Sequence, residues 1–268
     1  MALIRIAIAV IALAVVSQAS AATPAKRLTA KSAGVRATVT WRNGTGPFVK
    51  SVRVRIVRNG ALRLDQHLRK VYDLPVKLRV RDLDGNGEPE VVADFYTGGA
   101  HCCWYSLIYG YAGGHYSSLK QEWEDSQYGF SDLNHDGTVE FRSSDSRFAY
   151  EFTAYAGSAF PVQIWSYRAG KLVDTTRKYR SAVKQDAATL WRAYRADRHS
   201  SYPDARGILA AWMADEYLLG RQSTGWAKMR AANARGEFQG IGSGDIWPKG
   251  SKYLKALRKF LIKLGYAP

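Results

Sequence analysis

The sequence predicts a mainly β protein with an α-helical C-terminal part. Two observations carry this prediction. Short segments of alternating apolar and polar residues, separated by glycine-containing turns, run from residue 35 to about residue 180. Beyond that point the apolar residues recur with a period of about 3.6, which is typical of amphipathic helices.

The strand prediction is clearest in residues 51–58, SVRVRIVR. Alternation places Val52, Val54 and Ile56 on one face of this strand and arginines on the other. Asn59-Gly60 is a strong hairpin signal and closes the strand onto its neighbour. Further strands are expected at 35–41, 61–64, 76–81 and 90–96.

A weak internal repeat groups these strands. Hairpin glycines recur at Gly60, Gly114 and Gly170, a period similar to that of a propeller blade with about four strands. Two repeats and a partial third are too few to close a usual propeller of about four or more blades. The expected architecture is a propeller-like, open stack of small antiparallel sheets, or one curled sheet.

Four helices forming a small bundle are expected after Tyr179. Their apolar positions are Leu190, Trp191 and Tyr194; Ile208, Ala211, Trp212 and Leu219; Trp226 and Met229; and Tyr253, Leu254, Leu257, Phe260, Leu261 and Leu264. Gly220 and Gly265 are expected to end the second and fourth helices, and Ser251 to cap the fourth.

The N-terminus has the pattern of a secretion signal. Arg5 precedes an apolar run at 6–16, and Ala19-Ser20-Ala21 is a small-residue cleavage site. The run is shorter than the ~20 residues of a membrane-spanning helix. The predicted division is therefore a signal peptide at 1–21, a flexible leader at 22–34, a β-repeat domain at 35–180 and a helical bundle at 181–268. The mature chain is expected outside the cytoplasm, with no transmembrane segment.

Two acidic loops predict cation sites. The first contains Asp82, Asp84, Asn86 and Glu90, and the second repeats the spacing 50 residues later. Its members are Asp132, Asn134, Asp136 and Glu140. Oxygen side chains at these intervals in a tight, glycine-containing loop suit a hard cation such as calcium. The alternative is a pair of solvated hairpin turns, which the duplication in register disfavours.

The D-x-D-x-D-G-x-x-D/E pattern leading into a strand resembles the calcium loops of FG-GAP or VCBS-type repeats of secreted and cell-surface proteins. The resemblance covers about residues 76–179, and the GGAHCC segment is similar to a subset of small secreted bacterial proteins. The resemblance to these calcium loops also implies a backbone carbonyl ligand, from Glu88 in the first loop and from Thr138 in the second. Asn86 and Asn134 each replace an aspartate of the pattern, which is expected to weaken calcium binding.

The only cysteines are the adjacent Cys102 and Cys103. Export would take them to an oxidising compartment, which favours a disulfide between them. Neighbouring α-carbons lie ~3.8 Å apart, closer than in usual disulfides, so buried free thiols remain an alternative. A metal site with His101 is disfavoured, because consecutive strand residues point to opposite faces.

The formal net charge is +16 at pH 7, with the basic residues concentrated at both ends of the chain and an acidic excess between them. Alternation places Arg53, Arg55, Lys77, Arg79 and Arg81 on outward strand faces. These residues predict a polyanion-binding surface, against the alternative of a solvated face. An exported chain is not expected to meet nucleic acid.

The sequence favours a secreted, non-enzymatic binding module stabilised by calcium. The expected partner is an anionic cell-envelope polymer or a secreted protein, in the latter case as an inhibitor. No GxSxG, HExxH or P-loop motif is present. The rival hypothesis is a cell-wall-active hydrolase with unidentified carboxylates. Two of the three carboxylates Glu122, Glu124 and Asp125 could supply an acid/base pair. Acidic residues at exposed strand ends usually show the same pattern without any catalytic role.

Overall fold

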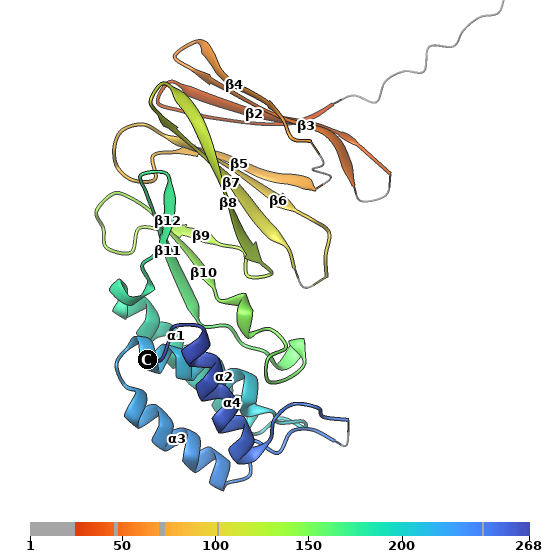
Figure 1. Ribbon diagram of the computed structural model, residues 1–268, viewed down its shortest axis with the longest axis vertical. Coiled ribbons are helices and arrows are strands. Elements are labelled where there is room, and N and C mark those ends of the chain that lie inside the picture. Colours follow the sequence, from red (N-terminus) through yellow and green to blue (C-terminus); the bar gives the residue numbers. More distant parts are fainter. Residues whose placement is uncertain (1–24, 46–47, 70–72, 101, 243) are drawn as a thin grey trace, which may run out of the picture.

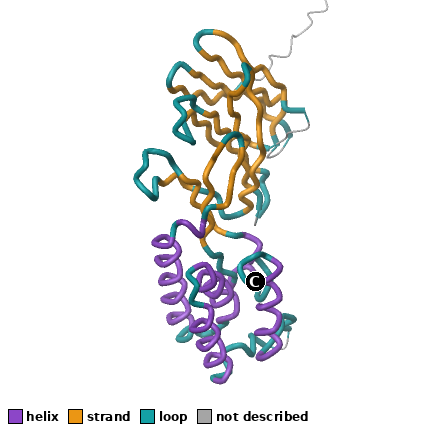
Figure 2. The backbone as a smooth tube through the Cα atoms, turned by 60° about the vertical axis from the view of Figure 1, so that its left-hand side comes forward, coloured by secondary structure: helices purple, strands orange, loops and turns teal. Residues whose placement is uncertain are grey.

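The computed structural model describes residues 25–45, 48–69, 73–100, 102–242 and 244–268. The predicted signal peptide at 1–21 lies outside the described residues, as do residues 22–24 of the predicted leader. The strands occupy one half of the elongated molecule and the helices the other (Figure 1, Figure 2).

Within the described residues, the strands form three four-stranded antiparallel sheets, each with its strands in chain order. Sheet A contains β1 (Lys26–Ser32), β2 (Val35–Asn43), β3 (Val49–Arg58) and β4 (Ala61–His67). Sheet B contains β5 (Leu74–Arg81), β6 (Glu90–Tyr96), β7 (Trp104–Ala112) and β8 (His115–Glu124). Sheet C contains β9 (Gly129–Ser131), β10 (Glu140–Ser144), β11 (Val162–Arg168) and β12 (Lys171–Asp174). The predicted open stack of small antiparallel sheets is confirmed.

Sheet B is the middle layer and is covered on both faces. Val91, Ala93 and Phe95 of β6 pack with the buried residues of β2 and β3 in sheet A. The alternate residue Val92 packs with Phe141 of sheet C. This arrangement explains why β6 is an almost continuous apolar run, since a strand buried on both faces needs no polar side.

The helices cover the far face of sheet C. They are α1 (Arg180–Asp197), α2 (Ala205–Leu218), α3 (Gln222–Ala234) and α4 (Gly250–Lys263), with short 3-10 turns η1 (Ser146–Phe148), η2 (Tyr155–Gly157) and η3 (Thr176–Lys178). Val162 and Ile164 of β11 belong to one core with the buried side chains of the helices. Gly220 and Gly265 have φ of +72° and +79°, as expected of residues that end helices.

Two local predictions differ from the structure. The segment predicted as a flexible leader contains β1, which pairs with β2 over its whole length from Lys26↔Trp41 to Ser32↔Val35. Its burial signal was weak, because β1 is an edge strand whose inward side has only two apolar residues, the partly buried Leu28 and Ala30. The fourth helix begins at Gly250, one residue before the predicted cap Ser251, and makes no side-chain cap bond.

Candidate metal centre

The first acidic loop connects β5 to β6, and Asp82 shapes it. Its Oδ1 accepts a hydrogen bond from the Gly85 amide at 2.7 Å, and its Oδ2 accepts one from the Gly87 amide at 2.8 Å. Both glycines have positive φ, +76° and +85°. The loop therefore needs glycine at these two positions to wrap its backbone around the Asp82 carboxylate.

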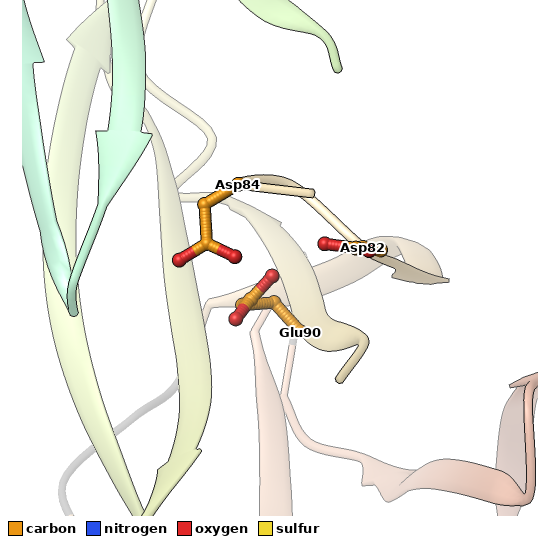
Figure 3. Close-up of side chains that lie close together, drawn as sticks. All are labelled: Asp82, Asp84 and Glu90. Carbon is orange, nitrogen blue, oxygen red and sulfur yellow. The ribbon is translucent and has the colours of Figure 1, made fainter. Parts of the chain in front are cut away.

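Three carboxylates of this loop converge. Asp82, Asp84 and Glu90 each offer an oxygen, and these oxygens lie within 4.8 Å of one another (Figure 3). Glu90 is 3% exposed, and its Oε2 accepts a hydrogen bond from the Leu83 amide at 2.9 Å. Burial raises the pKa of the Glu90 carboxyl to about 8, and the nearby Asp84 and Asp82 add to the rise. This donor set fits calcium, whose charge would offset the repulsion between the carboxylates.

The remaining predicted members of the loop have other contacts. The Asn86 side-chain oxygen accepts a hydrogen bond from the Glu88 amide at 2.7 Å, so it shapes the turn. The Glu88 side chain points to β3, where it forms an ion pair with Arg58 at 2.6 Å. The predicted calcium ligand at Glu88 is its backbone carbonyl, which this side-chain contact leaves available.

The second loop lies at the equivalent place in sheet C, between β9 and β10, and has the same frame. Asp132 accepts a hydrogen bond from the Gly137 amide at 3.1 Å, and the buried Glu140 accepts one from the Leu133 amide at 3.0 Å. Gly85 of the first loop lies against Thr138 of the second: a β-carbon added to Gly85 would be 2.9 Å from the Thr138 side-chain methyl. The two loops are therefore neighbours in space.

The second loop differs at Asp136. One Asp136 oxygen accepts hydrogen bonds from the amide and hydroxyl of Thr138, and the other accepts one from the Asn134 amide group at 2.7 Å. In the described parts of the chain, the first loop alone gathers three acidic ligand atoms within 4.8 Å. Because donors of the second loop already occupy both oxygens of the Asp136 carboxylate, this loop fits a cation less well than the first.

Two tyrosines that the sequence did not point to complete the surroundings. Tyr167 of β11 lies near Glu90 and Asp84, and burial together with these carboxylates raises the pKa of its hydroxyl. Tyr179 lies near Glu140, and burial together with this carboxylate raises the pKa of the Tyr179 hydroxyl to about 12. Glu90 and Glu140 are therefore each close to a tyrosine that is distant from them in the sequence.

Cys102 and Cys103 are joined to each other by a disulfide, across a cis peptide bond. The prediction that they pair is therefore confirmed in the structure, and the free-thiol and metal alternatives are not. His101 lies outside the described residues.

The five predicted basic residues do not form one surface. Arg53 and Arg55 are exposed on β3, where both lie beside Asp65. Lys77, Arg79 and Arg81 are on β5 in a different sheet. Arg79 is not on an outward face, because it forms an ion pair with the buried Asp94 and lies over the rings of Tyr128 and Phe130. The prediction failed here because sheet C covers this face of sheet B.

The outer face of sheet A is basic instead. Register places Arg27 of β1 opposite Thr40, and Thr40 opposite Arg53, so the two arginines flank one threonine in a row across three strands. Lys31 lies opposite Arg36. This basic face is defined by Arg27, Lys31, Arg36, Arg53 and Arg55, all exposed.

Comparison with known proteins places relatives along most of the chain. The family model described as the sll0997 C-terminal domain matches residues 183–265, which include nearly all of the four helices. The "Probable thylakoid lumen protein sll0997" of Synechocystis is 30% identical over 209 residues, 70% of this chain and 60% of that protein. The "Uncharacterized protein y4bJ" of Sinorhizobium fredii is 30% identical over 142 residues, 52% of this chain and 22% of that protein. The chain thus spans less than two thirds of either relative, and no solved structure matches it.

The helices in the described ranges include none that is both long and apolar enough to cross a membrane.

Proposed function

We propose that this chain is an exported, non-enzymatic binding module that calcium stabilises and that binds an anionic cell-envelope polymer. Three observations support export: the secretion-signal pattern at 1–21, the disulfide between Cys102 and Cys103, and the similarity to a protein named as a probable lumen protein. The FG-GAP or VCBS-like loops support calcium, and their carboxylate cluster at Asp82, Asp84 and Glu90 is its proposed site.

The basic face of sheet A is the observation that carries the polymer-binding proposal. Its five basic residues come from three adjacent strands, and cross-strand neighbours on one face lie about 4.5–5.5 Å apart. Lys31 and Arg36 are direct neighbours of this kind, whereas Thr40 separates Arg27 from Arg53. Cations one to two strands apart on one face can contact several charges of one polyanion chain. Each exposed contact is weak, but many in parallel give appreciable binding that salt screens.

In this proposal, calcium stabilises the loop next to the strand that carries part of the basic face. The first loop lies between sheets A and C in the stack, and the Arg58–Glu88 ion pair connects it to the strand that carries Arg53 and Arg55. A cation held by Asp82, Asp84 and Glu90 would fix the loop and, through this ion pair, the end of β3.

The test is salt elution of the mature chain from a heparin or teichoic acid column in the presence of calcium. The double variant Arg27→Glu, Arg36→Glu should elute at clearly lower salt than the parent. The matched control Lys252→Glu, Lys259→Glu changes the net charge equally on exposed positions of α4 and should elute close to the parent. If the two variants elute together, net charge alone governs retention and the basic face is not the binding surface.

A further inference from the structure

A cleft lies on the opposite side of sheet B from the basic face. It has a volume of about 440 Å³ and is bounded by the end of β8, by β10 to β12 of sheet C and by Leu264 at the end of α4. Val92 and Phe141 belong to the core between sheets B and C, and residues of both sheets line the cleft. Its size lies within the range of small-molecule sites, about 300–1,000 Å³.

The floor of the cleft is a polar patch on a sheet face that is otherwise apolar. Phe141 of β10 belongs to the core between sheets B and C, yet Ser143, two residues further on the same face, is polar. Ser143 lies opposite Gln163 of β11. Trp165, on the same face of β11, lies opposite Asp174 of β12. On this face Ser143 is buried and Gln163 is partly buried, whereas Asp174 is exposed at its edge.

The wall of the cleft is acidic. Glu122 and Glu124 project from the end of β8, where a bulge shifts the pairing with β7. Glu124 has φ of +52°, a left-handed conformation that is uncommon outside glycine. The lining includes the carboxylates of Glu122, Glu124, Asp145 and Asp174. Asp145 is ion-paired with Arg147, and Glu122 is ion-paired with Lys120 beside the cleft. An acidic cleft in a chain of net charge +16 sets it apart from the rest of the molecule.

We propose that this cleft binds a short oligosaccharide that carries amino groups. The indole of Trp165 offers an apolar platform for the face of a sugar ring. Gln163 has the neutral donor and acceptor that ring hydroxyls need. The buried Ser143 hydroxyl already donates to the Gln127 carbonyl and so shapes the floor. The carboxylate of Glu124 matches the charge of an ammonium group. Glu122 would exchange its exposed ion pair with Lys120 for a second ammonium group.

A basic peptide is the competing ligand, since it would also match the charge. Peptides that bind sheets usually pair their backbone with an edge strand. The groups that converge here are instead side chains on the face of sheet C, with a partly exposed indole among them. This arrangement favours a sugar. The site is separate from the basic face and does not depend on the polyanion proposal.

The experiment is calorimetric titration of the mature chain with a trimer of β-1,4-linked glucosamine, with the N-acetylated trimer and trilysine as comparison ligands. The proposal predicts saturable binding of the glucosamine trimer and at least tenfold weaker binding of the other two. Glu124→Gln should weaken binding of the glucosamine trimer about tenfold, because one charge-assisted contact is lost. Gln163→Ala should weaken it as well.

The matched control is Glu151→Gln, an exposed glutamate that does not line the cleft, and it should bind like the parent. Absence of binding of the glucosamine trimer would overturn the proposal. So would trilysine binding as tightly as the sugar, equal binding of the acetylated trimer, or unchanged affinity in both cleft variants when circular dichroism shows them folded.

Discussion

Arg58 of β3 and Glu88 of the first acidic loop form an ion pair across two sheets. The Arg58 Nη2 donates to Glu88 Oε2 at 2.6 Å, and Nε donates to Oε1 at 2.9 Å. The Arg58 guanidinium also lies 4.7 Å from the centre of the Tyr111 ring on β7. This contact joins the sheet that carries the basic face to the loop that gathers the carboxylates.

Loss of the Arg58–Glu88 ion pair should weaken calcium binding by the first loop. Glu88→Gln keeps the shape of the side chain but removes its charge, so the loop is held less firmly against β3. We expect a melting temperature lower by a few degrees at most, since a partly exposed pair contributes little by itself. We also expect weaker calcium binding by titration calorimetry. An unchanged calcium affinity would mean that the loop is fixed without Arg58.

The disulfide is open to a direct test. The mature protein purified without reductant should have an intact mass two hydrogens lower than after reduction. The bond takes up both cysteines of the chain, so a thiol label should not react under denaturing, non-reducing conditions. Labelling at two positions under those conditions would show that the pair is reduced in the exported protein.

A buried acid pair between α1 and α2 predicts how stability depends on pH. Asp215 is fully buried, and among the described residues neither of its carboxyl oxygens has a hydrogen-bond donor within reach. The Asp186 carboxyl group lies beside it, and a hydrogen bond between these two acids requires a proton on one of them. Burial raises the pKa of Asp215 to about 10, and Asp186 and Glu216 add to the rise while Arg221 opposes it.

The folded-state pKa lies above the unfolded value of about 3.9, so the folded protein keeps a proton that the unfolded chain releases. This contribution to stability is complete below pH ~4 and is lost as the pH rises toward 10, by at most about 1.4 kcal/mol per pH unit. Asp215→Asn replaces the shared proton with an amide. It should raise the free energy of unfolding at pH 8 more than at pH 4, as measured by urea titration.

The matched change Asp125→Asn, at a partly exposed turn, should leave the dependence on pH as it is in the parent. A parallel shift of the Asp215→Asn curve at all pH values would contradict the shared proton.

Local pattern was enough to predict most elements. Val52, Val54 and Ile56 alternate as a strand must, and the structure buries all three. Asp82 and Asp132 mark equivalent connections in sheets B and C because the same loop sequence recurs at the same place in each sheet. The ends of two helices could likewise be predicted, because the backbone after each helix has a positive φ that favours glycine, at Gly220 and Gly265.

What the sequence could not supply was the stacking of the sheets. Alternation shows that Lys77, Arg79 and Arg81 share a face, but not that sheet C covers part of it and pairs Arg79 with Asp94. Arg27 looked like part of a leader, because the inward side of this short edge strand has only two apolar residues, the partly buried Leu28 and Ala30. Tyr167 approaches Glu90 only through packing of two sheets, which no local signal encodes.

The most direct test of the account is calcium-dependent stability of the mature chain. After removal of cations with a chelator, calcium at about 100 times its Kd should add about 2.7 kcal/mol, which raises the melting temperature by roughly 5–10 °C in a chain of this size. Asp84→Asn should remove most of this rise, and Asp136→Asn, whose carboxylate is already occupied within its own loop, should remove little. A melting curve of the parent that calcium leaves unmoved would contradict the proposed calcium site.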